Sequence, residues 1–186
     1  MTTTSAIAAE ARGLPPEPTA RWILVLVAVF SVAWLAVLGW QVQVLPERVP
    51  THFGPGGEPD GWSSKAGALA FSVAMPVLTA YPLPLLSRLV MHWPGAINAP
   101  NRDWWTATAA RIRRFERLIR EDMWLFCVLM LGLFTAIQIS IVMASRSASG
   151  GLPPVLLFGS LGVFLVLTVA LTARILGARY AEQDVD

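Results

Sequence analysis

Charged residues are scarce in this 186-residue chain, where they make up 14% of the sequence, against roughly a quarter in an ordinary soluble domain. They are absent from four intervals, which cover residues 22–46, 66–87, 123–145 and 147–173. Each interval exceeds the ~18 apolar residues that indicate a membrane-spanning helix. Because a soluble protein could not cover four such helices with polar surface, we expect an all-α membrane protein with four transmembrane helices in a bundle.

Cysteine and histidine are also rare. The single cysteine, Cys127, excludes an intramolecular disulfide. The two histidines, His52 and His92, fall on opposite sides of a predicted span, so they cannot share a metal site. The net charge of +2 is too small to argue for nucleic-acid binding. We expect no bound metal, no cofactor and no nucleic-acid partner.

The four spans are predicted at about 22–44, 66–86, 123–144 and 153–176, within a membrane domain of residues 21–178. Residues 1–20 are rich in Thr, Ala and Pro and have no apolar period, which is typical of a disordered tail. Residues 179–186 form a second, polar tail. The run after the first tail is too long for a signal-peptide core and no small-residue cleavage site follows it, so the first span is predicted to be retained.

Lysine and arginine collect on the cytoplasmic side of short membrane loops. If the N-terminus is inside, 11 basic residues lie on the inner side and three, Arg48, Lys65 and Arg146, on the outer side. This asymmetry predicts that both termini are cytoplasmic and that residues 45–65 face outward. The bias toward Arg, Ala, Gly and Pro is typical of a GC-rich bacterial genome. The predicted location is the bacterial cell membrane, with a multi-pass topology.

The predicted outer segment reads LPERVPTHFGPGGEPDGWSSK, and its prolines and glycines exclude a long helix. Residues 49–53 are compatible with one short extended piece. The run Pro59-Asp60-Gly61 indicates a type I or type II turn. Ser63 or Ser64 is suited to cap the next helix. We expect a compact loop at this position.

Proline and charge patterns shape the second span and the inner segment that follows it. Pro76 removes a backbone donor, which predicts a kink in the second span. Asp103 is placed to cap a helix that begins at Trp104. This helix is amphipathic and leads into the third span, which is typical of a helix in the membrane interface. Its basic face is predicted to meet anionic lipid headgroups at the inner surface, although a role in topology alone is an equal alternative. The basic residues are Arg113, Arg114, Arg117 and Arg120.

Small residues form a ridge along the third span, where they recur at every fourth position. The ridge predicts close packing against another span, and a second copy of the chain is the alternative. Gln138 lies off this ridge near the middle of the span, so we expect it to find a hydrogen-bond partner inside the protein. The ridge consists of Gly132, Ala136, Ser140 and Ala144.

Two stretches carry a resemblance to a known family. The first is His52-Phe53, Gly57-Glu58-Pro59-Asp60-Gly61-Trp62 and Ser64-Lys65, and the second is Asn98-x-Pro100-Asn101-x-x-x-Trp105. Together they resemble the SdpI-type domain-of-unknown-function family of bacterial membrane proteins over residues 45–105. The chain departs from the family where Thr106-Ala107-Thr108-Ala109 replaces the frequent Leu-x-x-Pro-Glu. A four-span chain also has no room for the second module of the SdpI immunity proteins. The resemblance implies the loop architecture and a relation to toxin immunity or signalling.

The outer motif admits four interpretations, and its residues are His52, Phe53, Gly57, Glu58, Asp60, Trp62 and Lys65. His52, Glu58 and Asp60 carry side chains that can ligate a metal, and His52 with Glu58 could form an acid–base pair. In a structural role, Asp60 or Glu58 pairs with Lys65 or Arg48 while Phe53 and Trp62 fold onto the helix ends. In a recognition role, the two aromatic residues are anchors and the carboxylates select the ligand.

The leading functional hypothesis is binding. We expect a non-enzymatic membrane protein that recognises a protein or peptide at its outer face, with a link to immunity or signalling. The alternative is a transport or accessory subunit of a larger membrane complex, and a membrane-embedded hydrolase or metalloenzyme comes third. Apart from Arg174, near the inner end of the fourth predicted span, no acidic or basic side chain lies inside a predicted span, which argues against an ion relay.

Overall fold

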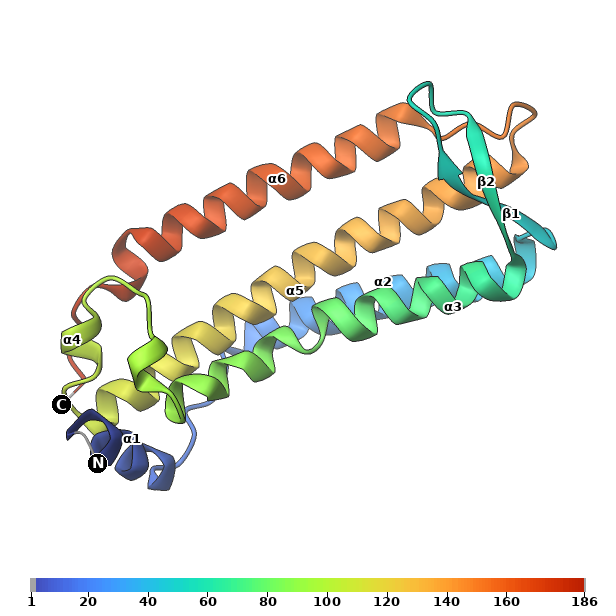
Figure 1. Ribbon diagram of the computed structural model, residues 1–186. Coiled ribbons are helices and arrows are strands. Elements are labelled where there is room, and N and C mark those ends of the chain that lie inside the picture. Colours follow the sequence, from blue (N-terminus) through green and yellow to red (C-terminus); the bar gives the residue numbers. More distant parts are fainter. Residues whose placement is uncertain (1–2, 186) are drawn as a thin grey trace. The chain divides into compact units, whose positions relative to one another are not determined.

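The computed structural model describes residues 3–185 and shows an all-α membrane protein, with four helical segments that are long and apolar enough to cross a membrane. The first is α2 (Arg21–Val44), and the second combines α3 (Lys65–Met75), η1 (Pro76–Ala80) and η2 (Leu83–Met91). The third lies within α5 (Ala109–Arg146), whose charge-free run covers residues 123–145, and the fourth is α6 (Pro154–Leu176). Figure 1 shows the order of the elements along the chain. The short elements are α1 (Thr3–Gly13), β1 (Arg48–Phe53), β2 (Pro59–Ser64), η3 (Pro94–Ala96), α4 (Arg102–Trp105) and η4 (Ala178–Tyr180).

The chain divides into two compact units. The terminal unit contains residues 3–25, 82–127 and 168–185, and the hairpin unit contains residues 26–81 and 128–167. The long helices contribute segments to both units, and each unit has its own buried residues.

Two local predictions for the second span are confirmed. Ser64 is the N-cap of α3, and its Oγ accepts a hydrogen bond of 3.1 Å from the main-chain N–H of Gly67. Pro76 ends the regular helix, and η1 continues the chain as a π-helical turn. A proline inside a helix has no N–H to donate and its ring crowds the preceding turn, so the local winding widens.

The inner helix begins later than predicted. Asp103 does not start it, because α4 is a separate four-residue helix that follows Asn101, whose φ of 55° is left-handed. Helix α4 then ends at Thr106, whose φ of −94° and ψ of 3° are not helical. The Oγ1 of Thr108 accepts a hydrogen bond from the Arg111 N–H at 3.3 Å, which caps the start of α5. From there α5 runs without interruption for 38 residues.

The N-terminal tail was expected to be disordered, and this expectation is wrong for the residues that form α1. Ala8 and Ala11 of this helix are buried, and they belong to the core of the terminal unit. The small alanine side chains let α1 approach the larger core residues closely. Met1 and Thr2 lie outside the described residues.

The core of the terminal unit uses the apolar face predicted for the inner helix. Trp105, Ile112, Phe115 and Leu118 are all buried there. They cluster with α1, residues of η2 and Tyr180, so this apolar face packs against protein. An amphipathic helix buries its apolar stripe wherever the chain supplies partners, and sequence periodicity does not say which.

The hairpin unit packs around the small-residue ridge of α5. A Cβ atom added at Gly132 would lie 3.1 Å from the Phe30 ring of α2, so the glycine permits a close approach of these helices. Ser140 and Ala144 of the ridge are fully buried. Internal packing is therefore confirmed for the ridge. A cavity of about 670 Å³, lined by apolar residues of α2, α5 and α6, lies beside Gly132.

Candidate functional site

The predicted outer segment folds as a β-hairpin. The strands β1 and β2 are antiparallel, with Arg48 opposite Ser64 and Pro50 opposite Trp62, and the register is irregular around His52. The extended piece predicted at residues 49–53 is confirmed by β1. Gly61 lies opposite His52, and a Cβ atom at Gly61 would come within 2.9 Å of the His52 Cβ. The two strands can therefore approach this closely only because residue 61 is glycine.

The turn of the hairpin precedes the position predicted for it. Gly54 donates its N–H to the Glu58 oxygen at 2.9 Å, and Gly57, with a φ of 78°, donates to the Gly54 oxygen at 2.9 Å. Pro59, Asp60 and Gly61 are part of β2 and form no turn. Glycine tolerates the left-handed conformation at position 57, so the turn closes within residues 54–58.

Buried side chains and a neighbouring loop hold the hairpin in place. Val49 is fully buried in a cluster with Leu45, Ala68 and Val142. At the turn, the Leu152 N–H donates to the Gly57 oxygen at 3.2 Å, so the connection between α5 and α6 contacts the hairpin. The hairpin is therefore anchored on one side, and its other side is free to display side chains.

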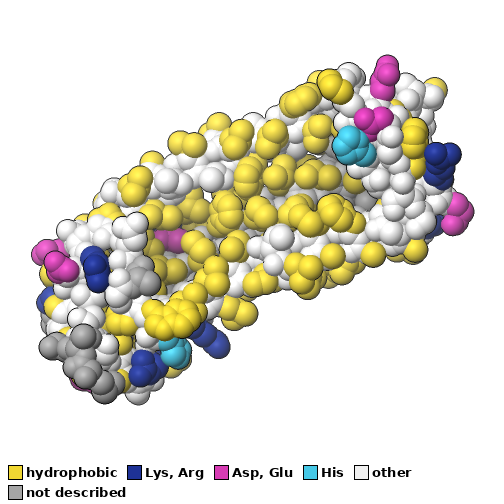
Figure 2. Space-filling view, viewed as in Figure 1, with side chains coloured by type: hydrophobic (Ala, Val, Ile, Leu, Met, Phe, Trp, Pro, Cys, Tyr) yellow, Lys and Arg dark blue, Asp and Glu magenta, His cyan; other side chains and the backbone are white. Residues whose placement is uncertain are grey.

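Two side-chain pairs lie on the exposed side of the hairpin. Nδ1 of His52 pairs with Oδ1 of Asp60, and these side chains are 76% and 52% exposed. The guanidinium of Arg48 lies 4.6 Å from the centre of the Trp62 ring, in a cation–π contact. Figure 2 shows charged and histidine side chains gathered at the hairpin. In the structural interpretation of the motif, Asp60 or Glu58 would pair with Lys65 or Arg48. This is wrong for Asp60, because cross-strand geometry brings Asp60 to His52.

The remaining motif residues surround these pairs. Phe53 is partly buried at the end of β1, whereas Trp62 is 47% exposed. The Glu58 side chain is exposed at the turn. Within residues 3–185, no three His, Cys, Asp or Glu side chains come close enough to hold a metal ion. The three-residue metal site considered for His52, Glu58 and Asp60 is therefore not assembled, and His52 pairs with Asp60 instead of Glu58.

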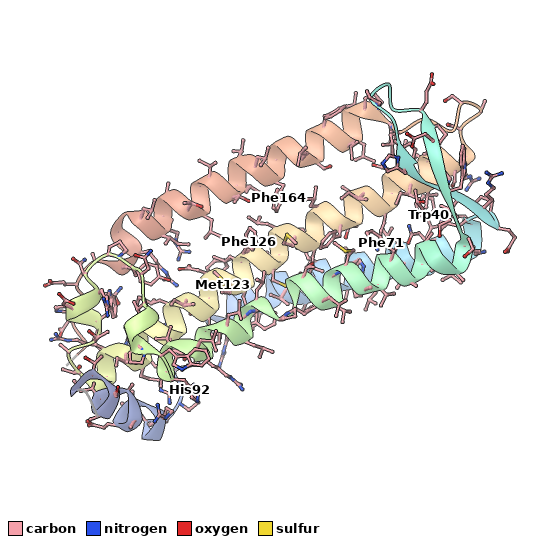
Figure 3. All side chains as sticks on the ribbon, in the orientation of Figure 1. Trp40, Phe71, His92, Met123, Phe126 and Phe164 are labelled. Carbon is pink, nitrogen blue, oxygen red and sulfur yellow. The ribbon has the colours of Figure 1, made fainter. Side chains whose placement is uncertain are left out.

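A shallow groove runs beside the hairpin in the same unit. It has a volume of about 340 Å³, and its lining includes the hydroxyl residues Thr51 and Ser63 and the apolar Phe71 and Ile141. Phe71 is 60% exposed on α3 (Figure 3). The hydroxyl groups of Thr51 and Ser63 thus lie next to an apolar wall, whereas the His52–Asp60 and Arg48–Trp62 pairs do not line this groove. Such a surface can bind a ligand with both polar and apolar groups.

A second polar group lies within the apolar helices of the hairpin unit. Nε2 of Gln138 donates to the Ser72 oxygen at 3.1 Å, and Nε1 of Trp34 donates to the same oxygen at 3.3 Å. Nε2 of Gln41 donates to the Gln138 main-chain oxygen at 3.3 Å. The predicted partner for Gln138 is thereby confirmed. The Oε1 atoms of Gln41 and Gln138 are buried without a partner in the described structure.

The predicted inner motif binds the C-terminal end of the terminal unit. Nδ2 of Asn101 and Nε1 of Trp105 both donate to the main-chain oxygen of Tyr180, each at 3.1 Å. Asn98 lines an apolar cavity of about 370 Å³, and Pro100 precedes the left-handed Asn101. The second motif stretch therefore positions the segment after α6.

Asp122 is the centre of a buried ionic cluster in the terminal unit. Its carboxylate accepts hydrogen bonds from Arg174 at 3.0 Å and from the Tyr180 hydroxyl at 2.8 Å, and it pairs with Arg179 at 3.3 Å. Burial and the Asp122 carboxylate raise the pKa of the Tyr180 hydroxyl far above its usual range. These contacts join α5 to the end of α6 and to the residues that follow it.

Glu121 is the second acid of this cluster and precedes the apolar run of α5. Burial alone would raise the pKa of its carboxyl group, but hydrogen bonds from Arg179 and the Ala20 N–H and the charge of Arg117 hold it below the ordinary 4.5. Oε2 of Glu121 lies 2.7 Å from Nη2 of Arg179.

The arginines predicted to meet lipid headgroups have partners inside the protein. Arg114 and Arg117 both pair with Glu17, at 2.7 Å and 2.9 Å. Arg120 pairs with Glu116 at 2.6 Å. Arg113 donates to the main-chain oxygens of Ala11 and Leu14 in the N-terminal segment. The pairing of Arg120 with Glu116 follows from their i,i+4 spacing, whereas no local pattern indicates the contact with Glu17.

The comparisons with known proteins cover part of the chain. Residues 23–80 match the model of a family described as a domain of unknown function, DUF1648. An uncharacterized protein of Archaeoglobus fulgidus is 40% identical over 74 residues, which are 38% of this chain and 39% of that protein. No solved structure matches the chain. The family match contains the hairpin, most of α2, and α3 with η1, and it overlaps the first stretch of the SdpI-type resemblance, which stays a prediction.

Proposed function

We propose that this membrane protein binds a peptide or protein ligand through the exposed side of its β-hairpin, at the outer face of a cell membrane. The observation that supports this role is the hairpin itself, which is anchored by Val49 and displays the His52–Asp60 and Arg48–Trp62 pairs. A role in toxin immunity or signalling follows from the SdpI-type resemblance. Binding is favoured over catalysis because no nucleophile stands next to the His52–Asp60 pair among the contacts that the described residues make.

Trp62 is the anchor of the proposed surface. An exposed indole stacked by an arginine is held in one orientation, so it loses little conformational entropy when a ligand covers it. Asp60 is oriented by its pairing with His52, and it supplies a negative charge on the same strand as Trp62. The proposed ligand therefore has an apolar group next to a basic group, as cationic amphipathic peptides do.

In-cell photo-crosslinking tests recognition. A photoreactive phenylalanine analogue replaces Trp62 in the full-length chain, and the same analogue at Leu78, exposed on η1 away from the hairpin, is the control. The proposal expects a discrete adduct in intact cells from position 62 that disappears when Asp60→Asn is added. Adducts that do not depend on Asp60, or equal adducts from both positions, would contradict it.

A growth assay tests the immunity role. The gene is deleted in its native host, and the strain is complemented with the wild-type chain, with Trp62→Ala or with Gly56→Ala, whose added Cβ meets no atom within 4 Å. We expect deletion to sensitise cells to at least one cationic peptide in a fixed panel, and Gly56→Ala but not Trp62→Ala to restore resistance. Unchanged sensitivity in the deletion strain rejects the immunity role.

The buried amides favour transport as a second candidate. Two unpartnered Oε1 atoms and a π-helical turn after Ser72 lie within apolar helices, and broken helices with free polar groups recur at transport sites. Solute flux into vesicles that contain the purified chain tests this function. Flux that falls with Gln138→Leu and not with Gln43→Leu, on the exposed side of α2, would support it.

A further inference from the structure

A basic cavity in the terminal unit has no part in the proposed outer-face function. It has a volume of about 400 Å³ and is bounded by the N-terminal segment, η2 and α5. The size lies within the range of pockets that hold small ligands. Its charged lining consists of Arg12, Arg88, Arg113, Arg120 and Glu116, with His92 at the edge. Figure 3 shows His92 at the end of η2.

Among the described residues, Glu116 is the carboxylate that lines the cavity, and its charge is already paired. Glu116 is 2% exposed, and its oxygens accept hydrogen bonds from Nη1 of Arg120 at 2.6 Å and 2.7 Å. The Ser87 hydroxyl donates a further hydrogen bond to Glu116 at 3.0 Å. Nη1 of Arg113 is more distant, at 3.9 Å from Oε2 of Glu116. The Glu116–Arg120 pair is therefore satisfied and leaves three other arginines around the cavity.

These three arginines have no closely paired carboxylate in the part of the chain that the structure describes. Arg12 donates to the main-chain oxygen of Met91 at 2.5 Å, and Arg113 donates to the oxygens of Ala11 and Leu14 at 2.9 Å and 2.7 Å. Nε of Arg113 is buried without a partner. Arg88 is exposed, and its side chain forms no hydrogen bond or ion pair within residues 3–185. Carbonyl oxygens orient a guanidinium but do not neutralise its charge.

We propose that this cavity binds an anionic phosphate group. A planar guanidinium presents paired donors that match phosphate oxygens, so arginines held in place by carbonyl contacts form a prepared phosphate site. Three like charges around one cavity repel each other, and a bound phosphate relieves that repulsion. Arg12 and Arg113 are the fixed donors, and Arg88 closes on the ligand from the exposed side.

The phosphate can belong to a lipid or to a soluble molecule, and the neighbouring residues favour a lipid. Leu85, Leu86 and Leu89 of η2 are 59%, 50% and 43% exposed and precede or flank Arg88 in the sequence. A lipid bound with its phosphate in the cavity could lay an acyl chain against such leucines. The sequence predicted that lipid headgroups contact the exposed face with Arg113 and Arg120. In this proposal the headgroup instead binds inside the cavity that these two residues form with Arg12 and Arg88.

The test uses the full-length purified chain after it is stripped of lipid by detergent washing. Native mass spectrometry measures binding of phosphatidylglycerol, with phosphatidylcholine as the neutral comparison, and calorimetry measures binding of inorganic phosphate and glycerol 3-phosphate. The variants are Arg88→Gln, which removes a side chain without an internal partner, and Arg102→Gln as the control, an exposed arginine of α4 outside the cavity.

We expect wild-type and Arg102→Gln proteins to bind at least one phosphate ligand, and Arg88→Gln to raise its Kd about tenfold, the loss for one charge-assisted contact. Arg88-dependent binding of phosphatidylglycerol alone identifies a lipid, and Arg88-dependent binding of the soluble phosphates identifies a metabolite. Equal binding by Arg88→Gln and wild-type protein, or no binding of any phosphate ligand, overturns the proposal. Unfolding temperatures of the two variants equal to wild type exclude a folding defect.

Discussion

Gln138 donates a hydrogen bond from Nε2 to the main-chain oxygen of Ser72 at a distance of 3.1 Å. That oxygen would ordinarily accept from the N–H four residues later, but residue 76 is proline and has none. The side chains of Gln138 and Trp34 satisfy the carbonyl instead. The interruption of one apolar helix is thus coupled to polar side chains on two others, as expected where proline interrupts a membrane helix.

Because of this coupling, we expect the stability effects of changing Gln138 and Pro76 to be non-additive in a double-mutant cycle. Gln138→Leu should cost about 1 kcal/mol of unfolding free energy, the usual range for an interhelical hydrogen bond in a membrane protein. The cost should shrink in a Pro76→Ala background, because alanine returns an N–H to the Ser72 oxygen. Unfolding in mixed detergent micelles measures both values, with the exposed Gln43→Leu as the control. Equal costs of Gln138→Leu in the two backgrounds would show that the proline and the glutamine are independent.

Among the charged residues, we expect substitution of Asp122 to lower the free energy of unfolding the most. Asp122→Ala leaves Arg174, Arg179 and the Tyr180 hydroxyl without their shared acceptor, so we expect a loss of about 3–5 kcal/mol. Tyr180→Phe removes a single hydrogen bond and should cost about 1 kcal/mol. Thermal unfolding and proteolysis of the C-terminal segment report both effects. Asp103→Ala, at an exposed carboxylate, serves as the control, and a similar loss there would contradict the assignment.

The ion pairs of Glu121 should make a contribution to the stability of the folded protein that is lost in acid. Since its pKa lies below 4.5 in the folded protein, its ion pairs stabilise the fold above that pH and are lost as the pH falls through the lowered pKa. Glu121→Gln should therefore flatten the decline in unfolding temperature on acidification below about pH 4.5. The exposed Glu182→Gln should leave the curve unchanged. A steeper fall in unfolding temperature for Glu121→Gln than for the wild-type chain would contradict the lowered pKa of Glu121.

Gly61 should be irreplaceable in the hairpin. Gly61→Ala places a Cβ 2.9 Å from the Cβ of His52, and we expect the strands to separate locally at a cost of about 1–3 kcal/mol. Gly56→Ala is the matched change in the same hairpin, where an added Cβ meets no atom within 4 Å. Hydrogen exchange of the β1 and β2 amides compares the two. Faster exchange for Gly56→Ala than for Gly61→Ala would contradict this packing.

Local signals predicted much of the fold. The Ser64 cap, the Pro76 interruption and the extended piece of β1 each depend on a few neighbouring residues, and apolar runs of sufficient length indicated the four spans. Gln138 was also assigned a partner correctly, because a buried amide must be satisfied. The partner itself, the Ser72 oxygen, follows from the missing N–H of Pro76 four residues later.

Contacts between distant residues could not be predicted in the same way. Glu17 lies nearly a hundred positions from Arg114, and no spacing rule connects them. Helix α1 depends on burial of Ala8 and Ala11 against residues far along the chain. In the hairpin, the turn at residues 54–58 decided the register and hence which acid meets His52. The turn predicted at Pro59–Gly61 is part of β2, and neither it nor the spacing of the motif indicated that Asp60 pairs with His52.

Cysteine labelling tests the orientation on which the proposed outer-face recognition depends. Gly56→Cys places a thiol at the hairpin turn, where a Cβ meets no atom within 4 Å, and Glu182→Cys places one at the opposite end of the topology. Cys127 is buried, so the wild-type chain is the blank. The account predicts that a membrane-impermeant maleimide labels Gly56→Cys in intact cells and labels Glu182→Cys only after permeabilisation. Labelling of Glu182→Cys in intact cells, with Gly56→Cys protected until the membrane is opened, would contradict it.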